Sequence, residues 1–590
     1  MNLDFQQQAA VMTDSPRVVC LAGAGSGKTR IIVERIARLI ENKKVSPYEI
    51  MAVSFTRKAS KELKKRLEER IGRGAHHITC GTIHSIALRF LKRFGDLVGL
   101  RGQSLTIYSD FEENYLLKEC AIELGIYKGK AWKIPKGDIL AVFEAYYQEG
   151  VVPSVDHPGL GIFNEFIARC HENNSLTYGA LMVGLRELLP HIAKFLTLKY
   201  IFVDEVQDID TLQWSIFNTL AELCHADLFV VGDIDQSIYE WRGARPGYLV
   251  EHQNDFQVFK VENNYRSSTL IVDAANHLIE HNQMRIERTM RPARLETGHV
   301  LHSFDCDTDR IAALISTIAE KRIGKGAFAV LSRNHILLRK LAIMLEVIRL
   351  PYTYVGRKTE LIESAPFRIF HAFLKLLVNE FDNFSFLLVR EPIGLDRPHY
   401  NEIRLRSTQE ARSHFQTWKA EEAPKNRSDF FDWFDLAKTD WTLPDSVRNL
   451  FGLWRKAGID PLVMREISEF IEEWIKENPD AGTADYLEWL ATYDLQDEIE
   501  EADERVKIMT IHAAKGLEWP TVMVIGCNEG ILPSKQSVEA NDIEPERRLM
   551  YVAITRAKDE LILAIRPERK EVGDKLYENP ISRFVSETLI

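Results

Sequence analysis

The chain has 590 residues, of which 45% are hydrophobic and 27% are charged, as is ordinary for a soluble globular protein. This length allows roughly three to five compact domains. The net charge of -11 excludes a protein coated in positive charge. It does not exclude nucleic-acid binding, because affinity follows local basic patches rather than total charge.

The cellular compartment of the protein can be predicted from its termini, its apolar runs and its cysteines. The apolar runs are far shorter than the roughly 20 residues that span a bilayer, and the start, MNLDFQQQ, lacks the basic region of a signal peptide. Seven scattered cysteines contain no CxxC pair, so we expect neither a disulfide framework nor a clustered metal site. These features predict a cytoplasmic protein with no membrane partner. Because the chain ends soon after Phe584, we expect no C-terminal nuclease domain.

The first part of the chain alternates short β-rich runs with helical patterns, which is typical of a parallel α/β sheet. The predicted elements are strands at 17–21, 50–55, 200–203 and 228–231, and helices at 29–42 and 57–71. Between about 85 and 198, helical patterns such as 111–124 and 139–148 take over. We interpret this stretch as a helical insertion between strands of one sheet.

The second part repeats this order. Strands are predicted at 300–304, 328–331, 507–510 and 521–525, around a helix- and Trp-rich stretch at about 383–500. The sequence therefore predicts two α/β cores, each interrupted by one helical insertion. Within the second insertion, Arg465–Arg505 carries 15 Asp/Glu and three Lys/Arg. This segment is either a solvated helix face with a charged linker, or a surface that repels phosphate or engages a basic partner.

A glycine-rich segment follows the first predicted strand and opens a helix, which is the context of a phosphate-binding loop. It consists of Ala22, Gly23, Ala24, Gly25, Ser26, Gly27, Lys28 and Thr29. Its glycines let backbone N–H groups turn toward an anion, and the helix N-terminus adds partial positive charge. Lys28 is placed for the β- and γ-phosphates and the Thr29 hydroxyl for Mg²⁺. The strict pattern begins with Gly, where this chain has Ala22.

Two carboxylates end another apolar strand, in the segment IFVDEVQD at 201–208. Asp204 is placed to hold Mg²⁺, directly or through water, and Glu205 to orient and deprotonate an attacking water. This pair alone is weak evidence, but together with the phosphate loop it predicts nucleotide hydrolysis, which needs charge neutralisation and a positioned nucleophile.

Nine sequence blocks, in order, resemble the superfamily 1 helicases of the UvrD/Rep/PcrA type. They are LDFQQQAAV, AGAGSGKTR, VSFTRKASKEL, GTIHS, VDEVQD, VGDIDQSIYEWRGA, NNYRSS, TIHAAKGLEW and ERRLMYVAITRAK. The resemblance implies two RecA-like P-loop parallel-sheet domains, each with a mainly helical insertion. The implied segments are a first core at 1–87 and 198–262, its insertion at 88–197, a second core at 263–380 and 501–590, and a reduced insertion at 381–500.

The resemblance also implies an ATP site between the two cores. Arg30 and Tyr265 resemble the pair that sandwiches the adenine, and Gln7 the residue that hydrogen-bonds its edge. Glu518 resembles the carboxylate that accepts from the ribose hydroxyl. The residues that the resemblance places at the γ-phosphate are Gln236, which senses it, and Arg266 and Arg556, which reach it from the second core.

For DNA, aromatic rings beside basic groups suit the stacking of single-stranded bases. The stacking candidates are Phe55, Tyr239 and Trp241, and the candidates for strand contact are Thr56, Arg57, Thr82, His84, Arg242, Thr510 and His512. The family usually has Asn where Arg57 stands, which puts that contact in question. Arg57 also opens a stretch to Arg73 with eight Lys/Arg and three Asp/Glu, which is either a solvated helix or part of the DNA track.

The implied activity is that of an ATP- and Mg²⁺-dependent DNA helicase that moves 3′ to 5′ and binds single-stranded DNA and single/double-strand junctions. Runs at 561–564 and 575–577 are expected to flank a hairpin whose tip, Val572-Gly573, lacks the aromatic residue of a strand-separating pin. With the reduced insertion, this leaves a translocase that strips proteins from DNA as an alternative. Another alternative is a nucleotide-gated subunit of a repair or anti-phage nuclease assembly, docked to a protein partner.

Overall fold

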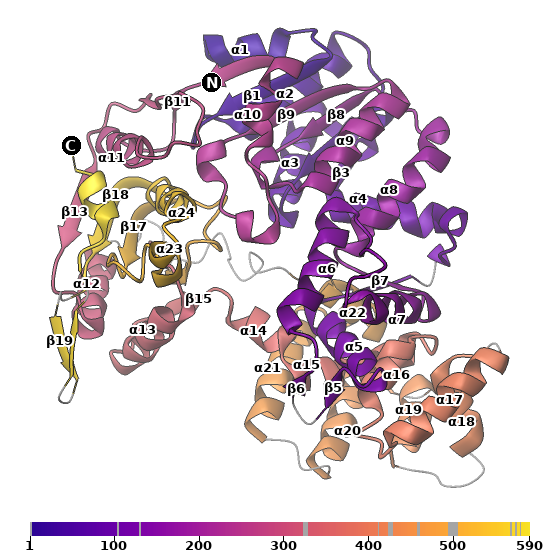
Figure 1. Ribbon diagram of the computed structural model, residues 1–590. Helices are drawn as coiled ribbons and strands as arrows, with labels where there is room; N and C mark the ends of the chain where they lie inside the picture. Colours follow the sequence, from indigo (N-terminus) through magenta and orange to yellow (C-terminus); the bar gives the residue numbers. More distant parts are fainter. Residues whose placement is uncertain are drawn as a thin grey trace.

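The architecture rests on two six-stranded sheets in which every pair of neighbouring strands is parallel, as the computed structural model in Figure 1 shows. The structure describes residues 3–589 apart from 103–104, 129–130, 322–327, 411, 423–428, 440, 457–460, 492, 494–504, 567–568, 573–574 and 579. This confirms the predicted α/β class with two RecA-like cores.

The first sheet has the order β10-β1-β9-β8-β2-β3. Its strands are β1 Arg17–Ala22, β2 Ile50–Ser54, β3 Thr79–Thr82, β8 Tyr200–Val203, β9 Asp227–Gly232 and β10 Gln257–Val261. Alternate residues of β1 enter different hydrophobic clusters, Val19 on one face and Cys20 on the other. Helices cover both faces, which explains why these strands are continuous apolar runs. The helices of this core are α1 Phe5–Met12, α2 Lys28–Glu41, α3 Arg57–Ile71, α4 Ile83–Phe94, α8 Ala180–Ile192, α9 Thr211–Cys224 and α10 Tyr248–Glu251.

The second sheet has the order β13-β18-β17-β14-β16-β15. Its strands are β13 His299–Ser303, β14 Ala329–Ser332, β15 Tyr352–Tyr354, β16 Val506–Thr510, β17 Trp519–Ile525 and β18 Ala557–Ala564. The same alternation recurs in β17, where Val522 and Met523 belong to opposite clusters. The helices around it are α11 Thr269–Ile279, α12 Thr308–Lys321, α13 His335–Val347, α23 Lys535–Glu539, α24 Glu544–Ile554 and α25 Arg583–Glu587.

The predicted strands of both sheets are confirmed to within one or two residues, and the predicted helix 57–71 coincides with α3. Strands β3, β10 and β15 were not expected. The order of the strands follows from packing rather than from any local pattern. Because all strands of a sheet are parallel, their carboxyl ends meet at one edge, where ligands bind in open α/β sheets.

The two helical insertions lie side by side in Figure 1, below the first core and to the right of the second. The first contains β4 Thr106–Tyr108, α5 Asp110–Glu123, β5 Tyr127–Lys128, β6 Ala131–Trp132, α6 Lys136–Glu149, α7 Leu160–Glu172 and β7 Ser175–Thr177. The second contains α14 Arg357–Glu363, α15 Ala365–Val378, α16 Asn383–Val389, α17 Arg397–Glu410, α18 His414–Glu422, α19 Asp429–Thr439, α20 Leu443–Lys456, α21 Pro461–Glu477 and α22 Thr483–Ala491. Among the described helices, none has both the length and the apolar character that a bilayer crossing demands.

One hydrophobic cluster runs through both insertions. The ring of Phe384 lies 4.7 Å from that of Tyr108 and 6.0 Å from that of Tyr115, and Arg397 Nη2 donates to Glu119 Oε1 at 2.7 Å. The apolar face of α15 joins this cluster rather than the second core. We therefore propose that the second insertion begins near Gly356, rather than at residue 381.

The expected hairpin forms, and the predicted run at 575–577 lies in its second strand, but its first strand is not the predicted one. The run at 561–564 lies inside β18, which pairs in parallel with β17 and β13. Instead, β19 Arg569–Val572 pairs antiparallel with β20 Lys575–Glu578. The prediction failed because β18 is a buried central strand and the pairing partner follows it in sequence. Val572 ends β19, and Gly573 lies outside the described residues.

The described part of the acidic segment supports its simpler interpretation. Helix α21 buries Ile467, Ile471 and Trp474, while five glutamates are exposed, namely Glu466, Glu469, Glu472, Glu473 and Glu477. Residues 494–504, which carry much of the remaining acidic charge, lie outside the described residues.

Candidate nucleotide and DNA sites

The phosphate loop turns sharply between β1 and α2. Gly25 and Gly27 have φ angles of +66° and +81°, which L side chains rarely adopt, and Gly27 is the N-cap of α2. The Ser26 hydroxyl donates to the Gly23 carbonyl at 2.7 Å. A Cβ atom at Gly25 would lie 2.7 Å from Cβ of Arg266, so the loop packs directly against the second core. A larger residue at position 25 would therefore separate the two cores.

The three adenine candidates lie around this loop. Gln7 Nε2 donates to the Ser26 carbonyl at 2.9 Å, and the Tyr265 backbone N–H donates to the Gly25 carbonyl at 2.9 Å. Asp4 connects the pair, because its carboxylate accepts from the Gln7 backbone at 2.7 Å and from the Tyr265 hydroxyl at 2.6 Å. The Tyr265 ring is 40% exposed, and Arg30 lies in the first turn of α2. The structure thus brings these residues to one side of the loop.

The two carboxylates follow β8 and face the loop. Lys28 Nζ donates to Glu205 Oε2 at 2.6 Å, and the Thr29 hydroxyl donates to Asp204 Oδ2 at 3.4 Å. Burial and the charge of Glu205 raise the pKa of Asp204. Burial acts the same way on Glu205, but Lys28 and Lys515 overcome it and lower the pKa of that carboxyl, so Glu205 is ionised.

This pair of oxygen donors fits a divalent cation. Hydroxyl and carboxylate oxygens are the ligands that Mg²⁺ prefers, and it usually completes its shell with water and substrate phosphates. Burial first, and the charge of Glu205 second, raise the pKa of Asp204, and Lys28 does not fully offset them, so a cation bound here would favour the ionised carboxylate. Among the described residues, no group of three or more His, Cys, Asp or Glu forms a self-sufficient metal site.

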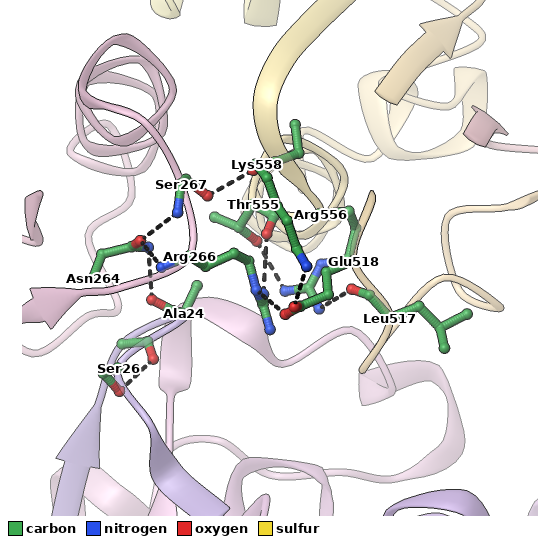
Figure 2. Close-up of polar contacts among 12 residues, drawn as sticks. Ala24, Ser26, Asn264, Arg266, Ser267, Leu517, Glu518, Thr555, Arg556 and Lys558 are labelled. Carbon is green, nitrogen blue, oxygen red and sulfur yellow. Dashed lines mark hydrogen bonds and ion pairs between the residues drawn. The ribbon is translucent and has the colours of Figure 1, made fainter. Parts of the chain in front are cut away.

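Two arginines of the second core meet this site. Arg556, buried at the end of α24, donates from Nη2 to Gln236 Oε1 at 3.4 Å and from Nη1 to the Leu517 carbonyl at 3.2 Å. Arg266 donates from Nε to Glu518 Oε2 at 2.6 Å. Figure 2 shows the side chains of Arg266, Arg556 and Glu518 meeting at one point. Burial, with the charge of Arg266 second, lowers the pKa of Arg556 to about 9, so two cations are held together where an anion would stabilise them.

The site also contains residues that the sequence alone did not single out. Gln207 Nε2 donates to Glu205 Oε2 at 2.6 Å, and its Oε1 accepts from the Asp233 backbone at 2.9 Å. Lys515 of the second core forms an ion pair with Asp208 and donates to the Gln236 carbonyl at 2.8 Å. Gln207, Asp208, Asp233 and Lys515 lie inside the recognised sequence blocks, which was their only signal.

The DNA candidates form an aromatic and basic group on both cores. The rings of Phe55 and Tyr239 stack at 5.1 Å, and the Arg242 guanidinium lies 4.7 Å from the Trp241 ring. The ring of His512, from the second core, lies 6.3 Å from Trp241 at 89°. Trp241 is 67% exposed, so much of its side chain is accessible to solvent beside Arg242 and His512. These residues come from segments far apart in sequence and meet at the carboxyl edges of the two sheets.

The remaining candidates lie where helices begin or a strand ends: Thr56, Arg57 and Thr82 at the starts of α3 and α4, and Thr510 at the end of β16. Thr56 and Thr82 are the N-caps of α3 and α4, and their hydroxyls accept from backbone N–H groups at 3.1 and 3.2 Å. Thr510 similarly accepts from the Ala513 backbone at 3.3 Å. Because each hydroxyl accepts in this hydrogen bond, it can also donate its own hydrogen to another acceptor. Arg57 is the first residue of α3.

The two histidines are neutral. Burial lowers the pKa of both His84 and His512 to about 4, and nearby arginines, Arg57 and Arg333 among them, add to the shift. The His84 ring stacks at 4.5 Å on Tyr178 of the first insertion, a residue that the sequence did not single out. Neutral rings contact a DNA strand by hydrogen bonding or stacking rather than by charge.

A phosphate loop opposed by arginines from a second parallel-sheet core defines a two-core P-loop nucleotide hydrolase. Comparison with known proteins then gives the family. Residues 3–257 match the UvrD/REP helicase N-terminal domain, and residues 259–442 and 462–567 match the UvrD-like helicase C-terminal domain. The chain belongs to the UvrD/Rep/PcrA family of ATP-dependent DNA helicases.

Individual relatives agree with this assignment. The chain is 30% identical to the ATP-dependent DNA helicase PcrA of Bacillus subtilis (strain 168), over 99% of this chain and 85% of the relative. It is 29% identical to the protein of the same name from Leuconostoc citreum, over 99% of this chain and 84% of the relative. The similarity therefore includes both cores and both insertions.

Proposed function

We propose that this protein is an ATP- and Mg²⁺-dependent motor that moves 3′ to 5′ along single-stranded DNA and unwinds tailed duplex. The observation that carries the proposal is the contact of Arg556 with Gln236 across the two cores. The phosphate loop and carboxylates belong to the first core, and the arginines to the second. A nucleotide held by both sets draws the cores together, and loss of its γ-phosphate releases them.

In the proposed chemistry, Lys28 and the loop N–H groups hold the phosphates, and Glu205 takes the proton of the attacking water. Glu205 is ionised and can therefore accept a proton, and its hydrogen bond to Gln207 orients it. Arg266 and Arg556 neutralise charge that develops on the γ-phosphate. Thr29 and Asp204 would hold Mg²⁺, which supplies further charge neutralisation at the phosphates. Gln7, Arg30 and Tyr265 would bind the adenine, and Glu518 the ribose.

Movement along DNA follows from where the strand candidates lie. Phe55, Tyr239, Trp241 and Arg242 belong to the first core, whereas Thr510 and His512 belong to the second. A strand that contacts both groups is displaced when the cores close and open. Stacking on flat rings gives little sequence preference, so we expect binding that is largely independent of base sequence. The 3′ to 5′ direction rests on the family resemblance.

A strand-displacement assay tests this proposal, with 3′-tailed, 5′-tailed and blunt duplexes, each with and without ATP. We expect ATP-dependent separation of the 3′-tailed substrate only. Separation of only the 5′-tailed substrate would contradict the direction. ATP hydrolysis stimulated by single strands, without separation of any substrate, would instead support the protein-stripping translocase, which displacement of a DNA-bound protein would then reveal.

A further inference from the structure

A third arginine of the second core lies at the interface, where its side chain contacts two carboxylates of the first core. Arg288 lies in the segment between α11 and β12 Arg291–Pro292, and its side chain is 5% exposed. Its Nη2 donates to Asp233 Oδ1 at 2.5 Å and to Asp235 Oδ2 at 3.3 Å. Both carboxylates follow β9 in the first core and are almost fully buried. Their charge therefore needs a partner, and Arg288 provides it.

Asp233, which contacts Arg288, also forms a hydrogen bond with Gln236. Its second oxygen, Oδ2, accepts from Gln236 Nε2 at 2.5 Å, while Gln236 Oε1 accepts from Arg556 Nη2 at 3.4 Å. The Gln236 amide is thus fixed at both ends, with its nitrogen toward Asp233 and its oxygen toward the second core.

The same aspartate is connected to the hydrolytic carboxylate. The Asp233 backbone N–H donates to Gln207 Oε1 at 2.9 Å, and Gln207 Nε2 donates to Glu205 Oε2 at 2.6 Å. A continuous series of hydrogen bonds therefore leads from Arg288 through Asp233 to both Gln236 and Glu205. Burial makes each of these bonds stronger than it would be in water.

We propose that Arg288 is a positioning residue for ATP hydrolysis, which holds the Asp233 carboxylate so that Gln236 presents its amide oxygen between the cores. Arg288 touches no part of the nucleotide in this scheme and acts through Asp233 and Gln236. The inference rests on the proposed hydrolytic role of Gln236. Because Arg288 comes from the second core, it makes the orientation of Gln236 depend on the closeness of the two cores.

The test compares steady-state ATP hydrolysis, in saturating single-stranded DNA, of the parent and of Arg288→Met. We expect kcat to fall about 10-fold or more, while KM and the Kd of a fluorescent ATP analogue stay within about twofold. Arg288→Lys, which keeps the cation, should recover part of the loss. Arg291→Met is the matched control, because Arg291 lies three residues further on, at the start of β12, but its side chain is 72% exposed, and it should leave kcat unchanged.

A double-mutant cycle separates positioning from a merely structural role. In a Gln236→Ala background, Arg288→Met should change kcat less than twofold, because the residue through which it acts is already absent. Equal losses in both backgrounds, or an unchanged kcat in Arg288→Met, would overturn the inference. If Arg288→Met does not fold, Arg288→Met with Asp233→Asn removes the opposite charges of Arg288 and Asp233 together, and near-parental kcat in that variant would equally refute the inference.

This experiment is independent of DNA unwinding. A parent protein that hydrolyses ATP but moves on no DNA substrate would contradict the proposed function and leave the Arg288 comparison intact. A parent that unwinds DNA, with an Arg288→Met variant of equal kcat, would contradict only the positioning role.

Discussion

Arg556 of the second core donates to the amide oxygen of Gln236 in the first core at 3.4 Å, and both side chains are buried. The two cores thus touch at the point where the γ-phosphate is expected. A guanidinium that stays charged and is held by the Val552 and Leu517 carbonyls is ready for a phosphate without large rearrangement.

Replacement of Arg556 by alanine should therefore impair hydrolysis far more than nucleotide binding. We expect kcat to fall at least about 100-fold, because the arginine contributes mainly when charge develops on the γ-phosphate. Steady-state kinetics and the Kd of a fluorescent ATP analogue check this. Arg583→Ala, a half-exposed arginine of the same core that pairs with Glu529, is the control. A defect confined to nucleotide affinity would contradict the assigned role.

Glu205→Gln should retain ATP binding and lose about 100-fold or more in kcat, because the amide keeps the shape of the side chain but cannot take a proton. Glu222→Gln, on the exposed side of α9, should behave as the parent. Normal turnover in Glu205→Gln would remove Glu205 as the base. The companion variant Lys28→Ala should lose turnover through loss of a phosphate contact.

Trp241→Ala should weaken binding of single-stranded DNA by about 1–3 kcal/mol, the usual contribution of one base stacked on an aromatic ring. Fluorescence anisotropy of a labelled oligonucleotide at fixed salt measures the change. Phe381→Ala removes a ring of comparable exposure, 54% against 67%, from outside the aromatic group. Equal effects of the two substitutions on DNA affinity would show that Trp241 does not stack on a base of the bound strand.

Phe384→Ala should destabilise the joined insertions by about 3–5 kcal/mol, because Phe384 is 3% exposed and packs between Tyr108 and Tyr115 of the first insertion. Urea unfolding, followed by fluorescence of the buried tryptophans of the second insertion, measures the loss. If the insertions were independent bodies, the substitution would leave proteolytic protection of α5 unchanged. We expect instead that α5 loses protection together with the second insertion.

His371 predicts a specific response to acid. Its Nδ1 and Nε2 lie 2.7 Å from the Phe367 carbonyl and the Tyr486 hydroxyl, and burial lowers its pKa from about 6.5 to about 3. The unfolded chain therefore binds the proton more readily, so this contribution to stability is complete above about pH 6.5 and is lost as the pH falls toward 3. Urea midpoints of His371→Gln should decline less than those of the parent between pH 6.5 and pH 5. Parallel declines would contradict a neutral buried His371.

Local sequence patterns were sufficient for the elements that carry the chemistry. β1, α2 and β8 are short segments whose apolar runs, glycines and terminal carboxylates lie within a few residues of one another, so their form follows from nearest neighbours. The long-range contacts were not predictable in this way. Arg288 and Asp233 are separated by 55 residues and Lys515 and Asp208 by 307, and each pair depends on how two sheets pack.

The contact between the two insertions could not be predicted from the sequence for the same reason. The sequence between 362 and 493 is rich in aromatic residues that join one hydrophobic cluster. No sequence pattern indicates that Phe384 packs against Tyr108 of the first insertion rather than against a helix of the second insertion. The first strand of the hairpin was predicted wrongly because the run at 561–564 is the buried end of the central strand β18, and the strand that pairs with β20 follows it in the chain.

The central claim is that one nucleotide is held by both cores. The most direct test is a crystal structure with a non-hydrolysable ATP analogue, Mg²⁺ and a single-stranded oligonucleotide. We expect Lys28 to contact the γ-phosphate from one side, and Arg266 and Arg556 to contact it from the other, with Arg266 released from Glu518. A nucleotide bound wholly by the first core, with Arg266 still paired to Glu518 and Arg556 still on Gln236, would contradict it.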